Sequence, residues 1–223
     1  DMDEKATSHP AQPDPAVVLK IIASYAQYGL IPAIIPPPSL EIPDPLERIP
    51  AQRSTDLQHL QELARRYAYV FYILPGPLPA TNTAYWGPPK RVGIPQRALT
   101  ANMGSATNVQ SISFQHGALA PQFVSGNAEE SLSGQVLPIK TFSSLRLPLA
   151  ARSAMLHTAK ARTVLSDNQS SGVSYLQQLA RAQAVTDQSM DQVVTADGEL
   201  DALRYGGILQ ARGLVGVRGV GTT

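Results

Sequence analysis

The chain has 223 residues, a formal net charge of +1 and no cysteine. The absence of cysteine excludes disulfides, thiolate metal sites and a cysteine nucleophile, and the balanced charge gives no indication of a nucleic-acid or anionic membrane partner. Charged residues make up 16% of the chain, against about 25% in an average soluble domain. So little charge fits either an ordinary Ala/Ser/Pro-rich domain or one that buries surface against other subunits.

The two ends give no targeting signal. The first ten residues, DMDEKATSHP, lack the apolar core of a signal peptide, and no run of 18 apolar residues predicts a membrane-spanning helix. Because the chain starts without Met and stops just after an apolar segment, we expect it to be a piece of a longer polypeptide.

The first predicted helix begins at Asp14 as N-cap, with Pro15 at N1, and ends at Gly29. Its apolar positions share one face: Val17, Val18, Ile21, Ile22 and Tyr25. Residues 30–50 contain seven prolines, which exclude a helix or a central strand. This segment is predicted to be extended chain on a surface, because it is too apolar for a solvated linker.

A second helix is predicted from a capping box formed by Thr55 and Gln58. Its predicted buried face is Leu57, Leu60, Leu63, Ala64 and Tyr67, and His59 is expected on the exposed side. The following segment, Tyr69–Leu74, is apolar on both faces, which predicts a strand covered on both sides.

From Tyr85 onward the apolar period changes to two, which indicates half-buried antiparallel strands. The alternation is seen around Leu99–Met103, Ile112–Phe114 and Val194–Leu200, and a last short strand is expected at Leu214–Val217. One further helix is predicted over Val173–Ala184, with its inward positions at Tyr175, Leu176 and Leu179. The pattern as a whole predicts an α+β fold.

No catalytic grouping emerges from the sequence. The four histidines form no metal-ligand pair, and neither a nucleophile elbow nor a phosphate-binding loop is present. Asp197 and Glu199 fall on one face of a predicted strand and could form a glycosidase pair, but no second feature supports this, and a solvated strand face is the better interpretation. We therefore expect no enzyme activity, no cofactor and no metal.

Tyr85–Pro89, which contains the only Trp, has two interpretations. If Trp86 is exposed, it would form a platform that binds carbohydrate or peptide. If it is buried, it would anchor a Gly-Pro corner against the core, and we favour this buried position.

Six segments in series carry a resemblance to a known family. They are VLKIIASYAQYGLIP (18–32), TDLQHLQELARRYAYVFYILPGP (55–77), NTAYWGPPKR (82–91), QRALTANMGSATNVQSISF (96–114), VVTADGELDALRYGG (193–207) and LVGVRGVG (214–221). Together they resemble the phage late control D family, the tail hub proteins of contractile phages, which are related to VgrG and to the hubs of contractile injection systems. Ala68 stands where such proteins often have glycine.

The resemblance implies an antiparallel barrel-like tube domain at 81–223, preceded by a helix–strand insertion subdomain at 1–80. It also implies a homotrimeric hub that joins the hexameric inner tube to the trimeric spike, with inner tube, spike and baseplate proteins as partners. Such a protein is assembled in the bacterial cytoplasm and becomes part of a tail or injection particle, without nucleic-acid binding or direct membrane insertion.

The candidates for subunit contacts are apolar strand and corner positions: Tyr85, Trp86, Leu99, Met103, Val194 and Leu214. Two alternatives stay open, a peptidoglycan hydrolase and a carbohydrate-binding module of a tail particle.

Overall fold

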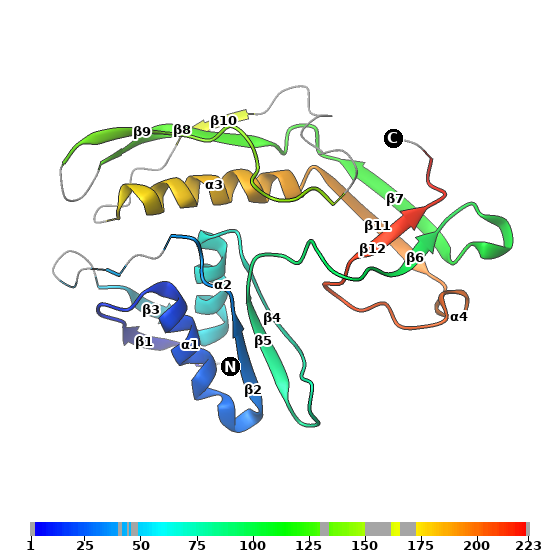
Figure 1. The fold of residues 1–223 in the computed structure, drawn as a ribbon, viewed down its shortest axis with the longest axis horizontal. Coiled ribbons are helices and arrows are strands. Elements are labelled where there is room, and N and C mark those ends of the chain that lie inside the picture. The colour runs from blue at the N-terminus through cyan, green and yellow to red at the C-terminus, as the bar shows by residue number, and fades with distance from the viewer. Residues whose placement is uncertain are drawn as a thin grey trace. The chain divides into compact units, whose positions relative to one another are not determined.

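The computed structural model describes residues 3–39, 42–43, 45, 49–129, 134–149, 162–165 and 173–221. Within them the chain is α+β, as predicted, and it divides into two compact units (Figure 1). Unit 1 is Asp1–Pro88, Gln122–Leu145 and Thr163–Gln188; unit 2 is Pro89–Pro121, Arg146–Arg162 and Ser189–Thr223. The strands of the described residues lie in separate sheets of two or three, none closed into a barrel, so the barrel-like tube domain stays a prediction.

The first layer of unit 1 is a three-stranded sheet, ordered β2-β5-β4, that packs against two helices. Strands β2 and β5 are parallel, and β4 and β5 are antiparallel. The bounds are α1 (Asp14–Ser24), η1 (Ala26–Tyr28), β2 (Leu30–Ile34), α2 (Asp56–Arg66), β4 (Val70–Pro75) and β5 (Asn82–Gly87). A two-stranded ribbon of β1 (Lys5–Ser8) and β3 (Ala51–Ser54) belongs to the same unit.

Trp86, on the central strand β5, is at the centre of the core of unit 1. Its side chain has no exposed surface, and its indole N–H donates to the carbonyl oxygen of Leu60 at 3.3 Å. The rings of Tyr67 and Tyr69 meet it edge-on. Around it pack apolar residues of both helices: Val17, Val18, Ile21, Ile22, Leu60, Leu63 and Ala64.

The starts of the two helices differ in how well the sequence predicts them. The capping box of α2 is confirmed, because Thr55 Oγ1 accepts from the Gln58 amide and the Gln58 side chain accepts from the Thr55 amide. Helix α1 instead has Pro13 at the N-cap, so the prediction of Asp14 was wrong by one residue. The Asp14 carboxylate is buried and accepts hydrogen bonds from Arg66 and Tyr67.

Three predictions about side-chain exposure in this layer were wrong. His59 is buried, because α2 is covered on that side by the segment that follows β1, whereas Leu57 is exposed. Ile73 of β4 is also exposed, because β4 is an edge strand rather than one covered on both faces. Part of the proline-rich segment forms β2, and Pro32 is tolerated there because β2 is the other edge strand.

The second layer of unit 1 is a sheet ordered β10-β8-β9 that packs on α3 (Figure 1). The bounds are β8 (Gln122–Glu129), β9 (Val136–Lys140), β10 (Arg162–Leu165) and α3 (Tyr175–Asp191). Val124, Ala128 and Ile139 contact Ala182 with Tyr175 and Leu179 beside it, whereas Leu176, predicted to point inward, is exposed.

Unit 2 consists of two ribbons of two strands each and short helical turns. Its elements are β6 (Gln96–Thr100), η2 (Gly104–Ala106), β7 (Val109–His116), β11 (Val194–Leu200), α4 (Ala202–Tyr205) and β12 (Val215–Arg218). The pair β7 and β11 is antiparallel as predicted, but β12 and β6 are parallel, since a two-residue period does not encode strand direction.

The compact units do not meet at residue 80. Strand β5 lies between β2 and β4, so unit 1 extends to Pro88, and it also includes β8, β9 and most of α3. The division into an insertion subdomain at 1–80 and a tube domain at 81–223 stays a prediction. No helix of the described residues is long and apolar enough to cross a membrane.

Candidate assembly surface

The ribbon of β7 and β11 has one apolar and one polar face. Its register pairs Phe114 with Ala196, Ile112 with Gly198 and His116 with Val194, so the side chains of these pairs share one face. The opposite face carries polar pairs: Ser111 with Glu199, Ser113 with Asp197 and Gln115 with Thr195. Such alternation is typical of a strand pair with one face against a core.

None of the described residues covers that apolar face. Phe114 is 47% exposed and Val194 is 51% exposed, and Ile112 is only half-buried. Close backbone packing keeps the face flat at Gly198, where a Cβ would lie 2.5 Å from the carbonyl oxygen of Ser111. Among the described residues the face is therefore an open strip of mostly apolar side chains, with the exposed His116 at one end.

Unit 2 has very little core of its own. Among its described residues the buried apolar side chains are Ala101, Val109, Pro121, Val193 and Tyr205. Isolated two-stranded ribbons are at best marginally stable in water, and they need further strands or a packed layer. The described residues of unit 2 therefore supply little apolar packing of their own.

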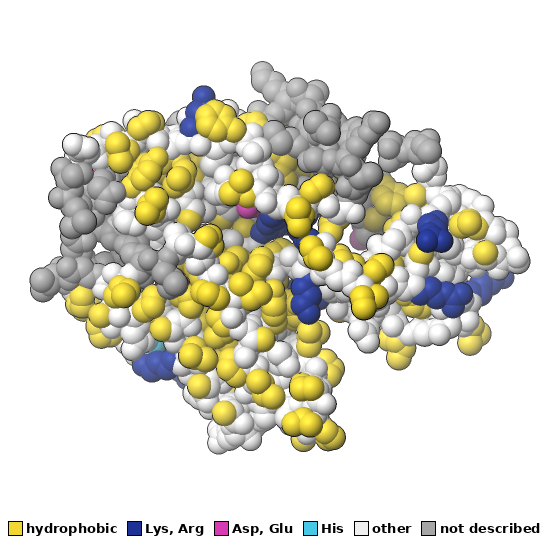
Figure 2. Space-filling model, viewed as in Figure 1, with side chains coloured by type: hydrophobic (Ala, Val, Ile, Leu, Met, Phe, Trp, Pro, Cys, Tyr) yellow, Lys and Arg dark blue, Asp and Glu magenta, His cyan; other side chains and the backbone are white. Residues whose placement is uncertain are grey.

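Large apolar side chains are exposed throughout unit 2, and hydrophobic side chains are widespread on the surface in Figure 2. Ile94, in the loop before β6, is 95% exposed. The others are Val92, Met103, Phe114, Leu119, Leu147, Leu149, Val194, Leu203, Ile208, Leu209, Val217 and Val220. Exposed apolar residues mark an interaction surface only where they form a contiguous patch, as the register shows for the face of β7 and β11.

The second ribbon is fixed by contacts from the turn around α4. Asp201 caps α4 by accepting from the amides of Leu203 and Arg204. The buried Tyr205 then donates its hydroxyl to the carbonyl oxygen of Arg97 on β6 at 3.0 Å. On this ribbon Leu99 pairs with Val217, and both are partly accessible.

The six predicted contact residues separate into two groups. Tyr85 and Trp86 are buried in the core of unit 1 and contribute to its folding. The other four are accessible in unit 2: Leu99 and Leu214 are half-buried, and Met103 and Val194 are exposed. Only Val194 belongs to the apolar face of β7 and β11, and a contact role for these residues stays a prediction.

Sequence reasoning missed several of the most exposed apolar residues. Phe114 was recognised as part of an alternating strand but not nominated as a contact, although alternation was the signal that could have found it. Ile94, Leu203 and Ile208 lie outside the strands, where no periodicity identifies them.

Neither alternative function, a peptidoglycan hydrolase or a carbohydrate-binding module, has a candidate site among the described residues. Trp86 has no exposed surface, so it cannot form a carbohydrate platform, and that interpretation is corrected. Asp197 and Glu199 lie on the exposed polar face of β11, opposite Ser113 and Ser111, as expected for a solvated strand face. No group of three or more His, Asp or Glu in the described part of the chain is placed to hold a metal ion.

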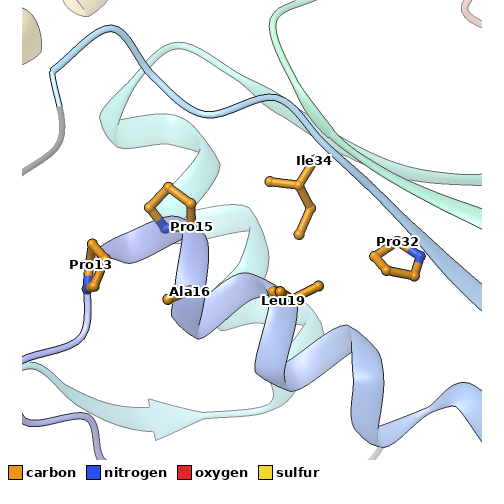
Figure 3. A pocket seen from close by; sticks show the side chains of 6 residues that line it. All are labelled: Pro13, Pro15, Ala16, Leu19, Pro32 and Ile34. Atoms are coloured by element: carbon orange, nitrogen blue, oxygen red, sulfur yellow. The ribbon is translucent and has the colours of Figure 1, made fainter.

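A shallow groove of about 480 Å³ lies between α1 and β2 in unit 1 (Figure 3). It is lined by Pro13, Pro15, Ala16, Leu19, Pro32 and Ile34. All six side chains are apolar, and proline also lacks a backbone N–H donor. The groove therefore has no side chain for acid–base or nucleophilic chemistry.

No protein family model matches this sequence, and no curated protein matches it either. The structure is similar to the crystal structure of the tail protein from Neisseria meningitidis MC58, with a TM-score of 0.42 and 12% sequence identity. The match covers 82% of this chain and 47% of that chain, so this chain spans about half of the length of the tail protein. A TM-score below 0.5 does not establish a common fold.

Proposed function

We propose that this protein is a structural subunit of a multi-chain particle, and that it buries the apolar face of β7 and β11 against other subunits. The single observation that carries the proposal is that face, an alternating apolar strip that remains open to solvent among the described residues. The very small core of unit 2 supports it, because burial in an assembly would supply the apolar contacts that unit 2 lacks.

We further propose that the particle is a contractile phage tail or a related injection machine, in which the protein acts as a homotrimeric hub between inner tube and spike. The support is the resemblance of six segments in series to the late control D family. In this role the protein is not an enzyme, and its work is mechanical: it fixes a symmetry transition and transmits force. Obligate interfaces of this kind commonly bury more than about 2,000 Å².

The first experiment measures the mass of the 223-residue chain by light scattering over a concentration series, alone and with candidate tube and spike proteins. We expect a trimer, or incorporation into a complex that electron microscopy shows at the tube–spike junction. A chain that stays monomeric at every concentration and binds neither partner would overturn the proposal.

A matched pair of variants tests the surface. Phe114→Asp places a charge on the apolar face, and Gln115→Asp places the same charge on the opposite face of the same strand. Burying a Phe side chain is worth about 1.5–3 kcal/mol, so Phe114→Asp is expected to weaken assembly at least about tenfold. Gln115→Asp is expected to change it by less than about threefold. Equal effects of the two variants would place the interface elsewhere.

A further inference from the structure

Two histidines, His9 and His59, form a buried stacked pair in unit 1. His9 follows β1 and His59 is on α2; their ring centroids are 6.0 Å apart and the rings are nearly parallel, at 17°. His9 is 2% exposed and His59 is 5% exposed. The backbone amide of His9 donates to the carbonyl oxygen of Pro50 at 2.8 Å, so the ring is fixed to the ribbon of β1 and β3.

The imidazole of His9 is buried with little compensation. Among the described residues neither Nδ1 nor Nε2 of His9 has a hydrogen bond of good geometry, and the side chains of Gln52 and Gln12 favour the charged ring by less than burial disfavours it. A buried polar group without a partner costs free energy even when neutral, and a buried unpaired charge costs much more. The neutral ring is therefore tolerated here, whereas the protonated ring is strongly disfavoured.

The charged groups around the pair do not offer a free counter-ion. Asp56, at the start of α2, already accepts from Lys5, Tyr25 and Gln52. Asp14 on α1 already accepts from Arg66 and Tyr67.

The remaining charged groups near the pair are of both signs. Lys20 of α1 opposes protonation of His9, whereas Asp56 favours it. Arg66 of α2 and His9 oppose protonation of His59, whereas Asp14 favours it. Glu62, which favours a charged His59, is an exposed carboxylate on α2.

We propose that the His9–His59 pair is an acid-sensitive latch that holds the β1–β3 ribbon on α2 at neutral pH and releases it when both rings become charged. The ribbon is suited to release because β1 is solvent-exposed along its whole length and pairs only with β3 among the described strands. The core around Trp86 contains no residue of β1 or β3, so it is expected to survive release.

The pH range follows from the direction of the shifts. Burial lowers the pKa of both His9 and His59 below the ordinary value of 6.5. The unfolded chain therefore binds protons that the latched state does not. Latching is strongest above about pH 6.5 and weakens as the pH falls through that value towards the lowered pKa values.

A second contact between ribbon and helix does not titrate in this pH range. Despite its burial, the pKa of Asp56 lies below its ordinary value, because Lys5, Tyr25 and Gln52 donate to the carboxylate. The ion pair of Lys5 and Asp56 therefore opposes release, and it has to break when the charged histidines push the ribbon off the helix. Release in mildly acidic solution is thus driven by the histidines and not by protonation of the carboxylate.

Hydrogen exchange of the full chain, corrected for the intrinsic pH dependence of exchange, tests the latch. Between pH 7 and pH 5 we expect protection of residues 5–9 and 51–54 to fall at least tenfold while β5 keeps its protection. The double variant His9→Gln/His59→Gln should lose this pH dependence. Unchanged protection of the ribbon in the wild type, or simultaneous loss in β5, would overturn the proposal.

A second measurement covers the case in which the double variant fails to fold. Titration of the histidine ring signals by NMR in the wild-type chain should give a pKa below 6.5 for both His9 and His59. The amide signals of the β1–β3 ribbon should change over the same pH range. Values at or above 6.5 for His9 and His59 would overturn the latch. The outcome does not depend on whether the protein is a hub subunit.

Discussion

Replacement of Trp86 by Ala gives the sharpest test of the folded core. Trp86 has no exposed surface, contacts Tyr67 and Tyr69 through its ring and donates its N–H to Leu60. A fully buried aromatic side chain cut back to Ala typically costs about 3–5 kcal/mol in the free energy of unfolding. Since whole domains are stable by about 5–15 kcal/mol, the variant is expected to be barely folded at room temperature.

The assay is urea unfolding followed by far-UV circular dichroism, because the variant lacks the only tryptophan. Leu57→Ala is the matched control, an apolar residue on the exposed side of α2, and it should cost less than about 1 kcal/mol. In the wild type, Trp86 should show blue-shifted fluorescence that iodide quenches poorly. Equal costs for the two variants, or a solvent-accessible Trp in the wild type, would refute the assignment of Trp86 to the core.

Substitutions at three further positions test local geometry, by denaturant unfolding at Ala68 and Thr55 and by hydrogen exchange at Gly198. Ala68 follows the C-cap of α2 and has a φ of 52°. The β-branched variant Ala68→Val should therefore lower the free energy of unfolding by about 2 kcal/mol or more. Ala68→Gly should change it by less than about 1 kcal/mol, because relief of strain offsets the lost methyl group. Thr55→Ala removes the N-cap of α2 and should cost about 1 kcal/mol; no loss would mean that the capping box is not formed in solution. Gly198→Val places a Cβ against the backbone of Ser111, so it should disrupt the ribbon of β7 and β11 and leave exchange protection in β5 unchanged.

The sequence was sufficient wherever the signal was local. The capping box of Thr55 and Gln58 could be recognised because its two hydrogen bonds join residues three apart. Alternation along β7 and β11 correctly assigned Ile112 and Phe114 to one face, because side chains of a strand alternate whatever lies around it. The core position favoured for Trp86 is confirmed as well.

What the sequence left undetermined is which surface each element meets. Alternation predicted that Phe114 and Val194 would be half-buried, but both are exposed, and periodicity carries no information about which residues lie against a strand face. The direction of β12 against β6 was likewise undetermined, because parallel and antiparallel partners show the same two-residue period.

The His9–His59 pair shows most clearly the difference between what local sequence predicts and what distant residues decide. From the sequence alone His59 was placed on the exposed side of α2, since its neighbours suggested a single apolar stripe. Burial of His59 depends on a segment 50 residues earlier, where β1 pairs with β3 and brings His9 onto the helix. The sequence by itself determined where the longer helices lie, the capping box of α2 and the alternating faces of β7 and β11, because these depend on neighbours along the chain. Only the tertiary structure decided which of those faces are buried, since burial depends on residues that are distant in sequence.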